Sequence, residues 1–334
     1  MDLFTHVILG YLLSYGIVGY GPQYLAAGAI AGGIPDADVL FFPLRRRFPL
    51  LRHHGITHSI VGVSAVALVG GLLIAPRISA GDPWIYVAVM EAAGLGHMLG
   101  DAFTHFSVAP LLPFHDRPLE IDADRAINFL TLSVSLGAIF LLGFERFRVP
   151  FASYTLTVYA LMAFYGGYIA LRLGARARIG AVRRRRPKYS VVVPTGNPLR
   201  WMLLYERRED GRLRTGYLLY HLGRGIVEGP FDLEVPLLAD GNAAPTPAAD
   251  AMEALERSYP IARRTGSMLD DTYHFARAEP TGPGAWTVHW YSLEYTAFGR
   301  AASVWVDIDP AGRLRARRGW ARPPRAPGAV VGVK

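Results

Sequence analysis

The sequence predicts an α-helical integral membrane domain followed by a small soluble α+β domain, mainly of antiparallel β-strands. The first domain is expected to hold about six apolar helices, four or more of them spanning. Six apolar stretches precede residue 174 of the 334-residue chain, whereas later segments are rich in aromatic and β-branched residues. Charge divides the chain in the same way. Residues 1–173 hold 10 basic and 11 acidic residues, and residues 174–334 hold 25 and 16.

The apolar stretches cover residues 3–20, 23–42, 59–79, 83–103, 127–144 and 153–173. Those that begin at 59, 83 and 153 are about 20 residues long, enough to cross a hydrocarbon core of about 30 Å. The second stretch is interrupted by Gly32, Gly33 and Pro35. Irregular backbone at that depth must be buried in protein or line a polar cavity. We therefore predict a multi-pass protein of the inner (cytoplasmic) cell membrane.

The arginines of the loops predict the orientation of the chain. They gather in the 43–58 loop, in the 104–126 loop and after the last apolar stretch, whereas the opposite connections are short. The N-terminus, the long loops and the C-terminal domain are therefore expected to be cytoplasmic. With alternating crossings, the histidines and aspartates at the ends of the first four stretches all reach the same membrane face.

The predicted domains are residues 1–175 in the membrane, a basic juxtamembrane linker over 176–188, a cytoplasmic mainly-β domain over 189–322 and a flexible tail over 323–334. Strands are expected over 189–193, 199–207, 212–222, 285–295 and 303–309, and one helix over 250–259. The arginine-rich linker favours membrane lipids as partners, through anionic headgroups. The absence of interleaved aromatic residues argues against nucleic acid.

Seven of the ten histidines fall within the first 115 residues, and most share short motifs with aspartates. Ionisable groups at the ends of apolar segments are costly and normally mark function. His97 and Asp101 are four residues apart and so share one helix face, and His54 and His58 have the same spacing. Because the chain has no cysteine, nitrogen and oxygen must hold any metal. This chemistry favours zinc, with manganese or iron as alternatives, and about one to three divalent ions.

The predicted metal ligands come from all four motif segments: His6, Asp36, Asp38, His54, His58, His97, Asp101 and His105. His53 and His54 are adjacent, so only one of them can face the cavity, and the pattern leaves open which one. Thr57 and Ser59 are placed to orient ligands or phosphate oxygens.

Two further expectations concern the remaining histidines. His115 and Asp116 form a lid, a ligand pair or plain solvated surface. The histidines of the C-terminal domain are expected to be structural: His221, His274 and His289.

Two metal ions held close together can activate a water and clamp the oxygens of a phosphoester. The leading hypothesis is therefore a metal-dependent hydrolase that acts on a small-molecule or lipid phosphoester at the cytoplasmic membrane face. Its predicted catalytic residues are Asp36, Asp38 and His58, with one of the two aspartates as general base. The alternatives are a divalent-metal transporter and a non-catalytic membrane scaffold with a structural metal. Stretches 127–144 and 153–173 contain no internal His, Asp or Glu, which argues against conduction.

Four blocks carry a family resemblance: FTHVILG (4–10), GGIPDAD (32–38), HHGITHS (53–59) and GLGHMLGDAFTH (94–105). They resemble the signature blocks of the YdjM/YbcI-type membrane-bound metal-dependent hydrolases, a bacterial and archaeal family that includes inner-membrane proteins under LexA control. That family is similar in turn to the zinc-dependent phospholipase C and single-strand nuclease superfamily.

The resemblance covers residues 1–125 well, and it implies one ligand set: His6, Asp36, His58, His97 and Asp101, with Asp38 and His54 close by. The chain departs from the family at His53-His54-Gly55, where His-Arg-Gly is usual. If His53 is the matching histidine, His54 replaces that arginine. The segment from VVPTGNPLRWMLLYE onward resembles an extension of longer members, for which the resemblance implies no chemistry.

Overall fold

The chain folds into two compact units, and the first comprises Met1–Ala177 with Pro194–Pro198. The second comprises Arg178–Val193 with Leu199–Lys334. The computed structural model describes residues 1–44, 48, 50, 54–104, 107–125, 127–148, 151–209, 212–236, 250–265, 274–297 and 300–321. The predicted flexible tail over 323–334 and the candidate residues His53 and His105 lie outside these ranges.

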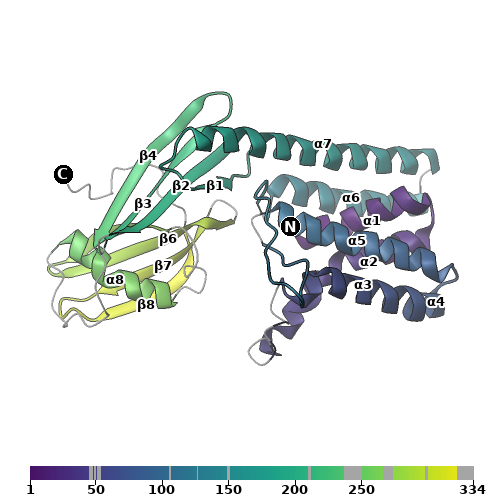
Figure 1. Cartoon of the computed structure of the whole chain (residues 1–334), viewed down its shortest axis with the longest axis horizontal. Helices are drawn as coiled ribbons and strands as arrows, with labels where there is room; N and C mark the ends of the chain where they lie inside the picture. The colour runs from purple at the N-terminus through teal and green to yellow at the C-terminus, as the bar shows by residue number, and fades with distance from the viewer. Residues whose placement is uncertain are drawn as a thin grey trace. The chain divides into compact units, whose positions relative to one another are not determined.

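The first unit is helical (Figure 1). Its elements are α1 (Leu3–Val18), α2 (Pro22–Gly33), the 3₁₀ helix η1 (Pro35–Leu44), the 3₁₀ turn η3 (Ile56–His58), α3 (Ile60–Leu68), the π-helical turn η4 (Val69–Ile74), α4 (Ala75–Ile78), α5 (Pro83–Phe103), α6 (Phe129–Arg148) and α7 (Phe151–Arg184). The interruption predicted at Gly32, Gly33 and Pro35 is confirmed, because α2 ends at Gly33 and η1 begins at Pro35.

The expectation of about six membrane helices, four or more of them spanning, is not supported. Among the described residues, two helices are long and apolar enough to cross a membrane, Ile60–Ile78 and Ser153–Arg184. Leu3–Val18 and Phe129–Gly143 are apolar but shorter. The 12 residues of α2 span only about 18 Å at 1.5 Å per residue, against a hydrocarbon core of about 30 Å. The first unit therefore holds two candidate spans and several shorter apolar helices.

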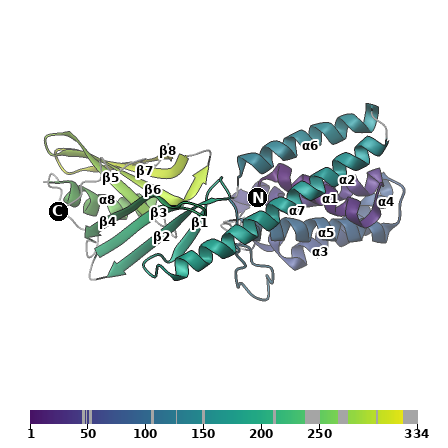
Figure 2. The same cartoon turned by 90° about the horizontal axis from the view of Figure 1, so that it is seen from above.

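Helices α1 and α2 approach each other through glycine. A Cβ atom on Gly28 would lie 2.9 Å from the backbone oxygen of Gly10, and one on Gly32 would lie 2.4 Å from the backbone oxygen of His6. Small residues four apart let helices in a membrane pack closely. Helix α5 packs against both α1 and α2 (Figure 2). This packing brings the ends of the three helices together, where the candidate site lies.

We expect Gly32→Ala to destabilise the first unit by about 1–3 kcal/mol, the usual cost of adding a methyl group to a tightly packed position. The added carbon has no room beside the His6 backbone. Thermal unfolding of the full chain in detergent measures the effect. Gly137→Ala in α6 is the matched control, because its Cβ would meet nothing within 4 Å. Equal unfolding temperatures for both variants would contradict a tight α1–α2 contact.

A buried polar network braces the C-terminal end of α5, beyond the candidate site. Arg172 of α7 forms an ion pair with Asp124 at 2.7 Å, and both side chains are almost fully buried. Tyr168 and Asn128 donate hydrogen bonds to the same carboxylate. The backbone nitrogen of Asp124 donates to the carbonyl of Phe103 at the end of α5. The network therefore ties α7 to the segment that follows the last turn of α5.

Among its described residues, the second unit contains two four-stranded sheets and the helix α8, besides the last residues of α7. Their elements are β1 (Val191–Pro194), β2 (Arg200–Glu209), β3 (Arg212–His221), β4 (Gly225–Pro236), α8 (Ala251–Thr265), β5 (His274–Gly282), β6 (Ala285–Ala297), β7 (Arg300–Ile308) and β8 (Leu314–Ala321). In each sheet the strands follow one another in chain order.

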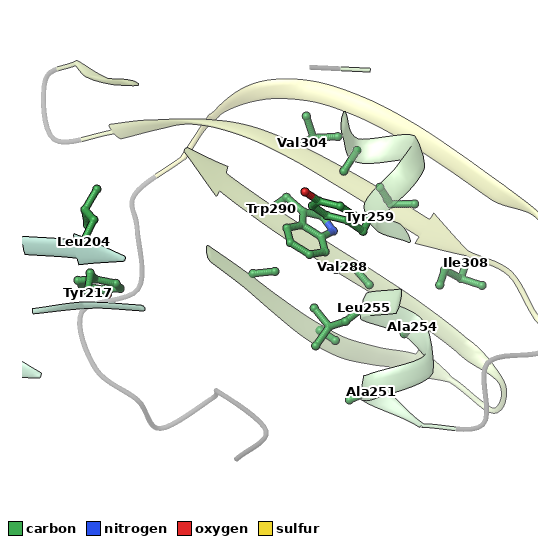
Figure 3. Packing of buried hydrophobic residues seen from close by; sticks show 14 of the residues in the cluster. Leu204, Tyr217, Ala251, Ala254, Leu255, Tyr259, Val288, Trp290, Val304 and Ile308 are labelled. Atoms are coloured by element: carbon green, nitrogen blue, oxygen red, sulfur yellow. The ribbon is translucent and has the colours of Figure 1, made fainter. Parts of the chain in front are cut away.

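Helix α8 packs on the β5–β8 sheet and closes the core of this unit (Figure 3). The ring of Tyr259 in α8 lies 5.1 Å from that of Trp290 in β6, and the Trp290 indole donates a hydrogen bond to Ser258 at 2.9 Å. Leu204 and Tyr217 of the β1–β4 sheet join the same cluster. One core therefore holds both sheets and the helix together.

Five predicted strands and the predicted helix are confirmed, with bounds shifted by a few residues. The sequence analysis missed β4, β5 and β8. β4 contains Gly229-Pro230, which is a turn signal. β8 has the sequence LRARRGWA, in which the arginines obscure the alternation of apolar and polar residues that is typical of a strand. Both sequences look like loops until a neighbouring strand supplies the hydrogen bonds.

Candidate metal centre

Four side chains from three segments converge at one end of the helical unit. Asp36 comes from η1, His58 from η3, and His97 and Asp101 from successive turns of α5. One ligand atom of each lies within 4.8 Å of the others. Within the described part of the chain they form the group of His and Asp that could hold a metal ion. We call these four residues the metal cluster.

The distances within the metal cluster suit ligands around a single ion. The Nε2 atoms of His58 and His97 are 3.1 Å apart, and each lies 3.3 Å from Oδ2 of Asp101. Oδ1 of Asp36 lies 3.8 Å from His58 Nε2 and 3.7 Å from His97 Nε2. Two nitrogens bound tetrahedrally to zinc at about 2.0–2.1 Å would be about 3.4 Å apart.

Hydrogen bonds behind the rings turn both histidines toward this centre. His97 Nδ1 lies 2.7 Å from the carbonyl oxygen of Gly32. Because a carbonyl only accepts, Nδ1 carries the proton and Nε2 keeps its lone pair. Thr57 donates its hydroxyl proton to Asp38, so its oxygen accepts from His58 Nδ1 at 3.0 Å. Asp38 itself lies 3.3 Å from the same nitrogen. Both Nε2 atoms therefore face the centre.

Two more histidines surround the metal cluster. His6 Nε2 lies 3.0 Å from Oδ1 of Asp101, and its ring stacks on that of His97 with centroids 3.6 Å apart. His54 Nε2 lies 3.6 Å from Oδ2 of Asp101. The amine of Met1 also contacts Asp101. The carboxylate of Asp101 thus lies beside four of the predicted histidine ligands: His6, His54, His58 and His97.

The residues fit a divalent cation. Oδ2 of Asp101 is buried and accepts no hydrogen bond. The facing Nε2 atoms of His58 and His97 lie 3.1 Å apart, in a hydrogen bond in which only one of the two nitrogens can donate. A buried polar atom without a partner is costly, and coordination of a metal would satisfy Oδ2 of Asp101 together with both nitrogens. The donor set of two imidazoles and two carboxylates matches zinc, manganese or iron.

We expect Asp38→Asn to lower metal affinity by about 10–100-fold without abolishing binding, since residues that orient a ligand typically have that effect. The structure places Asp38 behind His58, bonded to Thr57 and close to Nδ1 rather than to Nε2. Isothermal titration of the metal-free full chain with zinc measures the affinity. Complete loss of binding would instead assign Asp38 a direct bond to the metal.

Other predicted residues lie elsewhere. Ser59 caps α3, where its oxygen accepts from Gly62. His115 and Asp116 are largely exposed on a loop, 3.9 Å apart. His289 lies on β6 between the rings of Tyr291 and Trp305, and burial lowers the pKa of its ring to about 4, with nearby arginines acting in the same direction. His221 and His274 are also in strands of the second unit.

Two functional features escaped the sequence analysis. The carbonyl of Gly32 orients the ring of His97. A backbone acceptor of this kind leaves no pattern of side chains in the sequence by which it could be predicted. Glu91 lies within α5 and accepts a hydrogen bond from Ser64 of α3 at 2.8 Å. An acidic residue in the middle of the apolar stretch 83–103 was a signal that could have found it.

The comparisons with known proteins found a family for the helical unit. A family model described as YdjM inner membrane protein matches residues 1–177. All four residues of the metal cluster lie inside the matched segment. No curated protein and no solved structure matches the chain.

Proposed function

Since this chain belongs to the YdjM inner membrane protein family, we propose that its buried His/Asp cluster is the centre of a membrane-bound, metal-dependent hydrolase of phosphoesters. One observation carries the proposal. His58 and His97 direct their Nε2 atoms at one point, beside the carboxylate of Asp101. Such a preorganised set of nitrogen and oxygen donors is what a catalytic divalent ion requires.

When bound there, a zinc or manganese ion would lower the pKa of a water and polarise a phosphoryl oxygen. Asp36 is the member of the cluster that reaches solvent, with its side chain 20% exposed. We assign Asp36 the role of general base, because a group that takes a proton from water must touch that water. Asp38 is buried behind His58 and so acts as a positioning residue.

The reaction is a displacement at phosphorus. The water oxygen forms a new bond to phosphorus as the bond to the leaving oxygen breaks. The proton taken from water by Asp36 passes to the leaving alcohol, so that atoms and charge balance. The Gly32 carbonyl holds the ring of His97, and Thr57 and Asp38 hold the ring of His58. The donor atoms of both histidines therefore keep their positions throughout the reaction.

We further propose a multi-pass arrangement with the metal cluster and the C-terminal unit on the cytoplasmic side. Four arginines at residues 183–186 lie across the C-terminal end of the candidate span Ser153–Arg184, and basic residues at the end of a span favour the cytoplasm. Fusion of an alkaline phosphatase reporter after Lys334 tests this orientation. We expect an inactive reporter, and an active one would place this end in the periplasm.

The activity is tested on the purified full chain, loaded with zinc or manganese, against bis(p-nitrophenyl) phosphate, a nucleotide diester and a phospholipid. We expect hydrolysis of at least one ester, lost in His97→Ala and kept in His115→Ala, which changes an exposed loop histidine. Absence of turnover on all three substrates with metal bound would contradict the proposal. Metal uptake into sealed vesicles would instead favour transport.

A further inference from the structure

An apolar groove runs between α2 and the α3–η4–α4 segment. Its volume is about 980 Å³, in the range of sites that bind an extended small molecule. Its walls are formed almost wholly by aliphatic side chains, which include Ala26, Ile30, Ala65, Val69, Ile74 and Ile78. The few polar lining groups, Gln23 and Ser79, belong to the first turn of α2 and to the residue after α4.

A smaller cavity lies next to the groove, at the end of α2 that precedes the metal cluster. This cavity has a volume of about 80 Å³ and shares Ile34, Val66 and Met90 with the groove. Its lining also includes Pro35 and Thr57, each one residue before a member of the metal cluster. A molecule that fills both cavities therefore has one end next to the residues that precede Asp36 and His58, and the other at the start of α2.

The shape of the groove depends on irregular helical backbone. The π-helical turn Val69–Ile74 interrupts the span and contains Gly70 and Gly71. A Cβ atom on Gly70 would lie 2.4 Å from Met90 Cε, and one on Gly71 would lie 2.6 Å from the Val87 backbone. The turn is thus pressed against α5. Such widened turns occur often at functional sites.

The length of the groove matches one leaflet of a bilayer. Its α2 wall has 12 residues, about 18 Å of helix at 1.5 Å per residue. Half of a hydrocarbon core of about 30 Å, the depth of one acyl chain, is about 15 Å. The opposite wall is Ile60–Ile78, a candidate membrane span. An extended hydrocarbon chain therefore fits the groove both in length and in polarity.

We propose that this groove binds an acyl chain of a phospholipid whose phosphate lies at the metal cluster. The inference rests on the proposed function and specifies its substrate class as a lipid phosphoester. An apolar groove with its inner end one residue away from Asp36 and His58 along the chain complements a molecule with a hydrocarbon tail and an anionic head. Nucleotides and sugar phosphates have no group that would fill the groove.

Binding is tested without turnover. The full chain is reconstituted in nanodiscs with a phospholipid that carries a photoreactive diazirine at the end of one acyl chain, and the crosslinked peptides are mapped. We expect labelling concentrated in Pro22–Gly33 and Ile60–Ile78, and lower labelling in Ala65→Phe. If these helices and the exposed faces of α6 and α7 were labelled to the same extent, the label would report contact with bulk bilayer lipid only. That result would overturn the proposed binding of an acyl chain in the groove.

Substrate identity is tested by the ratio of phospholipid hydrolysis to bis(p-nitrophenyl) phosphate hydrolysis. Ala65 is exposed and lines the groove, and a phenyl ring there would exclude several methylenes. Because two buried methylenes correspond to about a tenfold change in binding, we expect the ratio to fall at least about tenfold. Ala160→Phe is the control, at an exposed position of α7.

Equal ratios for the two phenylalanine variants would overturn the acyl-chain site while leaving the hydrolase proposal in place. No hydrolysis of either ester by the wild-type chain would instead contradict the proposed function and, with it, the lipid as substrate. Thermal unfolding of both variants verifies that a lower ratio does not come from loss of fold.

Discussion

Replacing Asp101 with asparagine is expected to lower metal affinity by more than about 100-fold, beyond the range typical of residues that only orient a ligand. Asp101 lies within 3.3 Å of the Nε2 atoms of both His58 and His97, and its Oδ2 has no hydrogen bond. The amide keeps the shape of the side chain but removes the charge that a cation needs. Elemental analysis of the purified full chain, after dialysis against chelator and zinc, gives the metal content per chain.

The matched control is Asp116→Asn, the same chemical change at a carboxylate that is 89% exposed on a loop. We expect its metal content to equal that of the wild type. Retention of a full equivalent of metal by Asp101→Asn would contradict the assignment of the metal cluster. Helical circular dichroism of both variants separates loss of metal from loss of fold.

Replacing Arg172 with methionine is expected to destabilise the helical unit by about 3–5 kcal/mol, the usual cost of leaving one charge of a buried pair without its partner. The Asp124 carboxylate would remain buried beside Tyr168 and Asn128. Denaturant unfolding of the full chain, followed by a probe of the helical unit, measures the change. Arg178→Met, at an exposed position of α7, is expected to change stability by less than about 0.5 kcal/mol.

The double variant Asp124→Leu with Arg172→Met removes both charges and should recover much of the lost stability, because a buried pair is often replaced by apolar residues at little cost. A double variant no more stable than Arg172→Met would show that the network contributes through its other hydrogen bonds. The comparison thus isolates the charge pair from the packing around it.

The residues near the site could be predicted because their spacing has a direct geometric meaning. The break at Gly32, Gly33 and Pro35 indicated irregular backbone, and the structure ends α2 there. The spacing of His97 and Asp101 predicted one helix face, and both lie on α5, one turn apart. His54, in contrast, has a positive φ of 60° and precedes a 3₁₀ turn, so its expected helical spacing to His58 does not apply.

The remainder depends on long-range packing that one sequence does not display. The stretch 23–42 appeared long enough to span, yet it divides into a short α2 and a 3₁₀ helix because Gly33 and Pro35 end the regular hydrogen bonding. The ion pair of Asp124 and Arg172 joins residues 48 positions apart, and neither lies in a motif. β8 is recognisable as a strand only once β7 pairs with it.

The order in which the metal cluster is assembled has a consequence for synthesis of the protein. Asp36 and His58 leave the ribosome before His97 and Asp101, and the carbonyl that orients His97 comes from α2, whereas the hydroxyl beside His58 comes from the same 3₁₀ turn. An incomplete chain therefore has only two of the four donors of the metal cluster. An ion bound as proposed would be captured only after α5 has brought His97 and Asp101 to Asp36 and His58, so it would report that the helical unit has folded.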